Sequence, residues 1–175
     1  MPDSPEFQFF LYGKEHPVIP GSSLWYSPLP VKRTQIITGN SNSGLSEIHL
    51  GGYFTAARSF LEQDHFKLLT NAASRLAKRL ISSAQIRTIG ICIKKHGGFY
   101  HPARVEILGD DVSVSCVLNV ALSEDGAAWI QKEYHRLKRL TEKYPYSYLP
   151  EVFGIGAYES SHKPVRMFLG EWLEG

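Results

Sequence analysis

The sequence has little of what marks several common classes of protein. Its 175 residues include only two cysteines, Cys92 and Cys116, and no C-x-x-C motif, so we exclude a disulfide scaffold and predict two buried thiols in a reducing compartment. The net charge of +2 is too small to indicate a nucleic-acid-binding protein. No apolar run approaches the roughly 18 residues of a membrane span, and residues 1–6 lack the basic start of a signal peptide. We therefore predict a cytoplasmic protein with no membrane contact.

The first half of the chain divides into two parts. Residues 1–56 are rich in proline, glycine, serine and asparagine, and we predict an irregular N-terminal extension that contains short strand-like runs at residues 7–12 and 34–38. A helical period comes next, which predicts a helix at about residues 57–82 within a second unit, residues 57–175. The apolar face of this helix is predicted to contain Leu69, Ala73, Leu76 and Leu80.

The second half alternates strand-like and helical patterns. Three apolar, β-branched runs lie within residues 87–122, and two more lie within residues 148–173. Short glycine-containing connections between such runs favour antiparallel hairpins. Residues 124–142 have the helical period, with Ser123 as a candidate N-cap. The predicted fold class is α+β: a five-stranded antiparallel sheet with one inserted helix, preceded by the irregular segment and an amphipathic helix.

One residue of the inserted helix departs from its pattern. Glu133 lies within the apolar stripe, about 40° from Leu137 and 20° from Leu140 around the helix axis. A carboxylate buried there needs a cation or hydrogen-bond donors, because unpaired burial costs several kcal/mol. The alternative interpretation is a glutamate at the rim of the stripe that reaches solvent.

Three motifs occur in succession in the second half. Gly97-Gly98-Phe99 lies in the first hairpin turn, residues 131–140 contain E-Y-x-x-L-x-x-L, and residues 169–175 contain L-G-E-W-L-E-G. In this order they resemble the N-terminal lobe of the protein-kinase-like fold, which includes the aminoglycoside- and choline-kinase-like phosphotransferases. The resemblance covers residues 86–175 and leaves the first half of the chain outside it.

The resemblance implies ATP-dependent phosphoryl transfer, with ATP and Mg²⁺ as cofactors once a C-terminal lobe is present. The glycine turn would cover the phosphates, the helix glutamate would pair with a lysine of the third strand, and the hinge would carry the adenine. Catalytic roles are implied for Glu133 and Asn119, and no residue is implied as a metal ligand. Cofactor-binding roles are implied for Gly97, Gly98, Phe99, Val105, Val117, Glu171 and Leu173.

The sequence departs from the family pattern in three places. Asn119 stands where the third-strand lysine is expected, and an amide carries no charge to neutralise a phosphate. The glycine turn has only Gly97 and Gly98 in place of G-x-G-x-x-G. The chain stops at the hinge, whereas the catalytic aspartate and the magnesium-binding residues of the family lie in the C-terminal lobe. We therefore expect this chain alone to be inactive and to bind no nucleotide tightly.

These departures suggest partners and alternative functions. The expected partner is a C-terminal lobe or another protein, and apolar surface left exposed without that lobe favours self-association. One alternative function is a non-catalytic, pseudokinase-like regulator or scaffold. Another is an unrelated α+β nucleic-acid-binding domain, which the small net charge disfavours. That domain would use the basic and aromatic residues Lys94, Lys95, His96, Phe99 and Tyr100.

Overall fold

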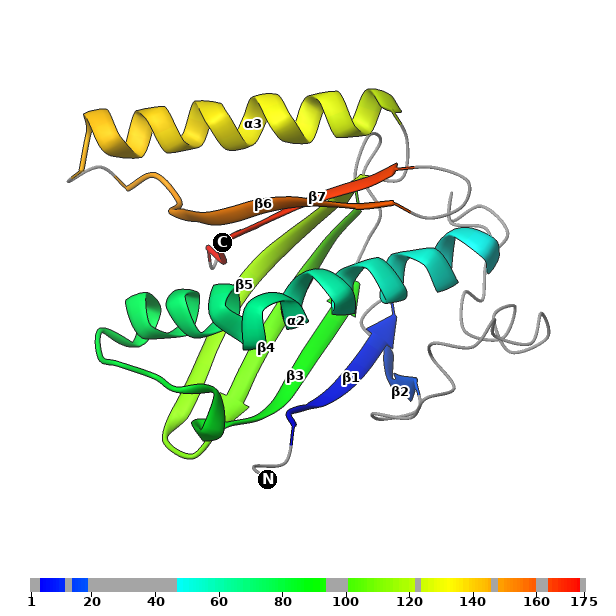
Figure 1. The fold of residues 1–175 in the computed structure, drawn as a ribbon, viewed down its shortest axis with the longest axis vertical. Coiled ribbons are helices and arrows are strands. Elements are labelled where there is room, and N and C mark those ends of the chain that lie inside the picture. Colours follow the sequence, from blue (N-terminus) through cyan, green and yellow to red (C-terminus); the bar gives the residue numbers. More distant parts are fainter. Residues whose placement is uncertain are drawn as a thin grey trace.

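The chain folds as an α+β structure in which helices lie on a mixed β-sheet (Figure 1). The computed structural model describes residues 4–11, 14–18, 47–93, 101–121, 124–145, 148–159 and 164–173. Its elements are β1 (Glu6–Leu11), β2 (Lys14–Val18), α2 (Glu47–Ala77), the 3₁₀ helix η2 (Ser83–Gln85), β3 (Ile86–Ile93), β4 (His101–Gly109), β5 (Val112–Ala121), α3 (Glu124–Lys143), β6 (Val152–Glu159) and β7 (Pro164–Glu171).

The sheet has seven strands in the order β2-β1-β3-β4-β5-β7-β6. Strands β3 to β7 pair antiparallel throughout, as the sequence predicted, and α3 is the predicted inserted helix. The predicted count of five strands was wrong, because β1 and β2 extend the sheet and β1 pairs parallel with β3. The segment predicted to be irregular therefore contributes two strands and the start of α2. The strand-like run at 34–38 lies outside the described residues.

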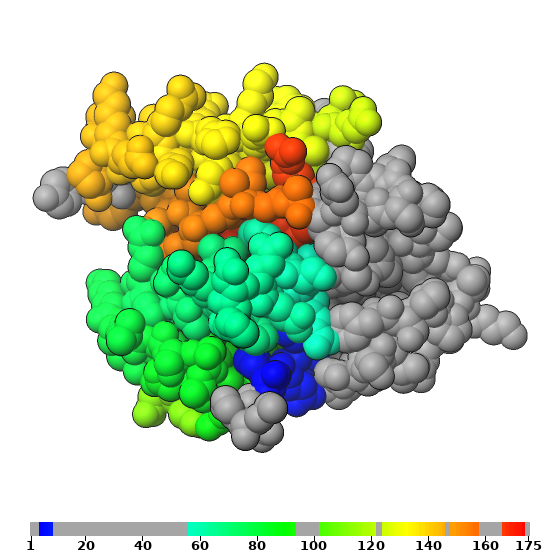
Figure 2. Space-filling view, viewed as in Figure 1, coloured from blue at the N-terminus to red at the C-terminus, as the bar shows by residue number. Residues whose placement is uncertain are grey.

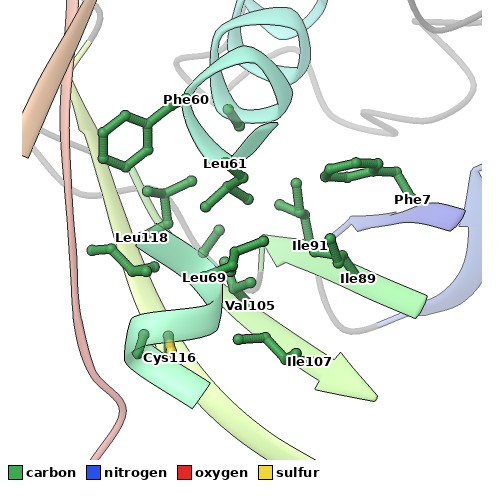
Figure 3. Packing of buried hydrophobic residues seen from close by; sticks show 14 of the residues in the cluster. Phe7, Phe60, Leu61, Leu69, Ile89, Ile91, Val105, Ile107, Cys116 and Leu118 are labelled. Atoms are coloured by element: carbon green, nitrogen blue, oxygen red, sulfur yellow. The ribbon is translucent and has the colours of Figure 1, made fainter. Parts of the chain in front are cut away.

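One face of the sheet carries the larger apolar core, with α2 packed over it (Figure 3). Two glycines of β6 allow α2 to approach closely. A Cβ at Gly156 would lie 2.5 Å from Phe60 Cε2, and one at Gly154 would lie 2.7 Å from Leu68 Cδ1. Fully buried members of this core include Leu61, Leu69, Ile89, Ile91, Val105, Ile107, Cys116 and Leu118.

Helix α2 is interrupted in its middle. Asp64, His65 and Phe66 have φ of 52°, 53° and 63°, a left-handed backbone that costs L-residues about 1–2 kcal/mol each. The Phe66 ring stacks on Phe7 of β1, with centroids 6.3 Å apart, so the interruption is joined to the core. The helix also ends earlier than predicted. Leu80 is 89% exposed and not part of the apolar face, because α2 ends at Ala77.

The other face of the sheet carries a smaller core under α3. Ala121 and Phe168 project toward α3, whereas their neighbours Val120 and Leu169 project into the α2 core, so the two helices lie on opposite faces. Tyr134 of α3 packs on Phe168 with ring centroids 5.8 Å apart. Helix α3 contacts mainly β5, β7 and β6, so the described helices leave part of this face uncovered.

Two further features complete the fold. Strand β6 lies at the surface between α2 and α3 (Figure 2). Among the described residues, no helix is long and apolar enough to cross a membrane.

Candidate functional site

The α3 face of β5 holds the polar residue that the sequence singled out. Asn119 is 7% exposed, and its neighbours on adjacent strands are Pro102 and Phe168. It projects to the same face as Ala121, which belongs to the α3 cluster. Of the residues whose burial the structure describes, Asn119 is the one buried polar side chain. Strand alternation therefore places the uncharged amide of Asn119 on the face of the sheet that carries α3.

Glu133 lies on the flank of α3 that faces β5. At about 100° per residue, Gln131 and Lys138 lie on the opposite flank from Glu133. Gln131 accepts a hydrogen bond from Arg166 of β7, and Lys138 lines a hollow beside the start of β6. The flank with Glu133 is therefore turned toward β5 and the uncovered part of the sheet.

The side chain of Glu133 is half-buried. Within the described part of the chain it has no hydrogen bond or ion pair, and none joins it to Asn119. The structure thus places both residues on one side of the sheet without a direct bond between them.

The predicted nucleotide contacts divide between the two faces of the sheet. Val117 lies two residues before Asn119 on the same strand and face, and it is half-buried. Val105 faces the other way and is fully buried in the α2 core, because it pairs with Cys116 while Arg104 pairs with Val117. One ligand cannot contact both valine side chains. Gly97, Gly98 and Phe99 lie outside the described residues.

The predicted hinge begins at the end of β7. Glu171 is joined twice to Glu151: its N–H donates to the Glu151 carbonyl at 2.7 Å, and its Oε2 accepts from the Glu151 N–H at 3.1 Å. Gly170 lies against Val117, since a Cβ there would be 3.6 Å from Val117 Cγ1. Leu173 is 52% exposed. Gly170 thus adjoins Val117 at the edge of the α3 face, whereas Glu171 pairs with Cys116 and projects toward the α2 side of the sheet.

Arg104 and Trp172 form a pair on this face that the sequence did not predict. The Arg104 guanidinium carbon lies 5.3 Å from the ring centroid of Trp172. Its Nη2 and Nε donate to Ser115 Oγ at 3.1 and 3.3 Å, and Nε lies 3.2 Å from Glu106 Oε1. The signal was present in β4, where Arg104 and Glu106 alternate with buried apolar residues.

These contacts hold the Arg104 guanidinium group against Ser115, Glu106 and Trp172. The indole Nε1–H of Trp172 is buried and has no hydrogen-bond partner among the described residues. A buried donor left in this way costs about 1–3 kcal/mol. Arg104 therefore lies beside Val117 with its positive charge engaged by several neighbours. The indole N–H of Trp172, next to it, is an unsatisfied donor within the described part of the chain.

A hollow of about 450 Å³ lies at the C-terminal end of α3. Arg75 of α2 forms an ion pair there with Glu151 and lies over the Phe153 ring, 5.8 Å from its centroid. Lys138 and Glu171 also line it, so the hollow contains charges of both signs. It lies at the end of the predicted hinge and on the far flank of α3 from Glu133.

Metal chemistry has no support on the described residues, and neither has thiol chemistry at Cys116. The prediction of two buried thiols holds for Cys116, whereas Cys92 is half-buried. Burial, and then the nearby Glu171 carboxylate, raise the pKa of the Cys116 thiol to about 12, so it stays protonated at neutral pH and is a poor nucleophile or ligand. In the part of the chain that the structure describes, no three His, Cys, Asp or Glu side chains are grouped to hold a metal ion.

No family model matches the chain, and no curated protein matches it.

Proposed function

We propose that residues 86–173 are the nucleotide-binding lobe of a kinase-like phosphotransferase, and that this chain does not transfer phosphate by itself. The observation that supports this proposal best is the side of the sheet on which Asn119 lies. In the family that the sequence resembles, a helix glutamate pairs with a third-strand residue, so helix and residue must share one face. Asn119 occupies the third antiparallel strand, and α3 lies on the face to which it projects.

Two further features support the proposal. Helix α3 is inserted between β5 and β6, after three consecutive antiparallel strands, as the motifs required. The predicted hinge leaves β7, which pairs directly with β5, so Gly170 adjoins Val117 on the α3 face. A ligand held at the hinge would therefore lie on the face that contains Asn119 and Glu133.

Weak binding of Mg-ATP by this chain alone is part of the proposal, and the charges on the described part of this face support it. Asn119 brings no charge, and two cations on this face are equally near to it in register. Arg104 is engaged by Ser115, Glu106 and Trp172, and Arg166 donates to Gln131. Phosphoryl transfer depends mainly on positioning and on charge neutralisation, and the described part of this face supplies little free positive charge. The catalytic activity of the proposed enzyme therefore requires a second lobe.

A non-catalytic regulator is the second candidate. The uncharged Asn119 and the internal contacts of Arg104 favour it. A lobe in which Asn119 replaces the lysine and Arg104 is bound internally retains its shape while it loses its phosphate site. The two candidates differ in whether a catalytic lobe is joined to the hinge in the full-length protein. An unrelated nucleic-acid-binding domain gains no support, because its proposed residues lie outside the described part of the chain.

The test restores the expected lysine. Asn119→Lys should raise the affinity for Mg-ATP at least about tenfold over the wild-type chain, measured by calorimetry. The gain should disappear when Glu133→Gln is added, because the glutamate would hold the new lysine in place. Ser113→Lys is the matched control, since Ser113 lies exposed on the same strand and face and adds the same charge. A folded Asn119→Lys chain that binds Mg-ATP no better than Ser113→Lys would refute the proposal.

A further inference from the structure

The edge of β6 is an open side of the sheet. Strand β6 is last in the strand order and pairs only with β7 among the described strands. The space-filling view shows β6 at the surface between α2 and α3 (Figure 2). Gly154, Ile155 and Gly156 are partly exposed, and Ala157 is exposed. Half of the backbone N–H and C=O groups of such an edge point away from the sheet.

This edge lacks the usual protection against pairing. Exposed edges are normally blunted by charged side chains or proline, and Val152–Ala157 contains neither. The bulge between Val152 and Gly154 interrupts only the start of the strand. An occupant of this edge must be an extended polypeptide, because only a strand matches alternating donors and acceptors along its length.

We propose that a second copy of this chain occupies the β6 edge, by antiparallel pairing of two β6 strands about a two-fold axis. Pairing centred on Ile155 places Ile155 opposite itself and Gly154 opposite Gly156, with matching residues on the same face. No like charges oppose each other in the middle of the pair, where they would be destabilising.

The ends of the paired strands also suit a second copy. Glu151 of one copy comes near Glu159 of the other, which would bring two acidic residues together. Arg75 already forms an ion pair with Glu151 within one copy, so one of the two acidic residues at each end has a cation as its partner. Helix α2 covers Gly154 and Gly156 from one face and keeps that side of the edge apolar through Phe60 and Leu68. The result is one continuous sheet through two copies.

Ala157→Glu tests this interface. Its cross-strand neighbour within one copy is Arg166, an opposite charge, so the fold should tolerate the substitution. Ala128→Glu, on the exposed surface of α3, is the matched control. Sedimentation should show a monomer–dimer equilibrium for the wild type and for Ala128→Glu. Ala157→Glu should raise the dimer dissociation constant at least about tenfold, because the change acts twice across the two-fold axis.

A wild-type chain that stays monomeric at every concentration would overturn the proposal and leave the edge to an extended segment of another protein. A dimer unaffected by Ala157→Glu would overturn it as well. Hydrogen exchange on the wild type provides a test that needs no variant. Amides of Val152–Ala157 should exchange more slowly as the protein concentration rises, and exchange rates independent of concentration would contradict pairing at this edge.

Discussion

The two faces of the sheet are built from the same strands and yet differ in what they bury. The α2 face is covered by apolar side chains that are fully or almost fully buried, from Phe7 through Ile91 to Leu169. The α3 face has a smaller apolar cluster around Phe168 and Tyr134, and beyond it lie polar and charged side chains. The difference separates two roles: one face holds the fold together, and the other leaves polar side chains partly exposed, where we propose that a ligand binds.

The physical cause of this difference is the extent of helix coverage. Buried residues of α2 belong to one apolar cluster with buried residues of β1, β3, β4, β5 and β7. Helix α3 covers mainly β5, β7 and β6, so the rows with Arg104 and Glu106 stay partly exposed. Side chains of an antiparallel sheet that remain in contact with water on one face are free to be polar.

The largest expected effect on stability comes from shortening a leucine to alanine, and it should differ between the two faces of the sheet. Leu69→Ala, in the α2 core, should lower the free energy of unfolding by about 2–5 kcal/mol. Leu137→Ala, on the half-buried stripe of α3, should lower it by about 1 kcal/mol, because less apolar area is removed from water. Urea denaturation of both variants measures the two values. Equal losses of unfolding free energy would contradict the difference in packing between the two faces.

Alkaline pH should destabilise the protein through Cys116 in the α2 core. Burial and Glu171 raise the folded-state pKa of Cys116 from 9.0 to about 12, so the folded state keeps the proton that the unfolded state loses. The contribution is therefore fully present below pH 9 and falls by about 1.4 kcal/mol per unit as pH rises from 9 toward 12. Cys116→Ala should be less sensitive to pH over this range. Equal alkaline sensitivity in the two proteins would contradict a buried, protonated thiol.

The smallest expected effect falls on Glu133. With no hydrogen bond or ion pair to lose among the described residues, Glu133→Gln should change the free energy of unfolding by no more than about 0.5 kcal/mol. In an Asn119→Lys background the same change should cost more, because it removes the carboxylate that we propose as the partner of the new buried cation. A double-mutant cycle by thermal denaturation measures the difference. A large effect of Glu133→Gln in the wild-type background would mean that Glu133 has a structural partner.

Local pattern predicted much of the second half of the chain. Helical period predicted α3 closely, and β-branched runs with short connections predicted the antiparallel strands. The predicted N-cap, Ser123, lies outside the described residues. The parallel pairing of β1 with β3 could not be predicted, because it joins segments that are far apart in the sequence. The same holds for the interruption in α2, where Phe66 takes a strained backbone to reach Phe7.

The candidate site could be predicted only in part. Asn119 and Glu133 were found because each breaks a pattern, an expected lysine in one case and an apolar stripe in the other. Val105 was grouped with Val117 by motif, and strand alternation places them on opposite faces. Arg104 and Trp172 meet only because β7 lies beside β5, and sequence pattern alone does not fix that neighbourhood.

Mapping the contacts of a bound nucleotide tests most directly whether the α3 face binds a ligand, as we propose. Mg-ATP would be added to the Asn119→Lys chain, and backbone amide shifts would be monitored by NMR. We expect shifts at Val117, Gly170 and Glu171 and along the Glu133 flank of α3, with Leu69 and Ile89 in the α2 core unchanged. Shifts centred on the α2 core, or no shifts at saturating nucleotide, would contradict the account.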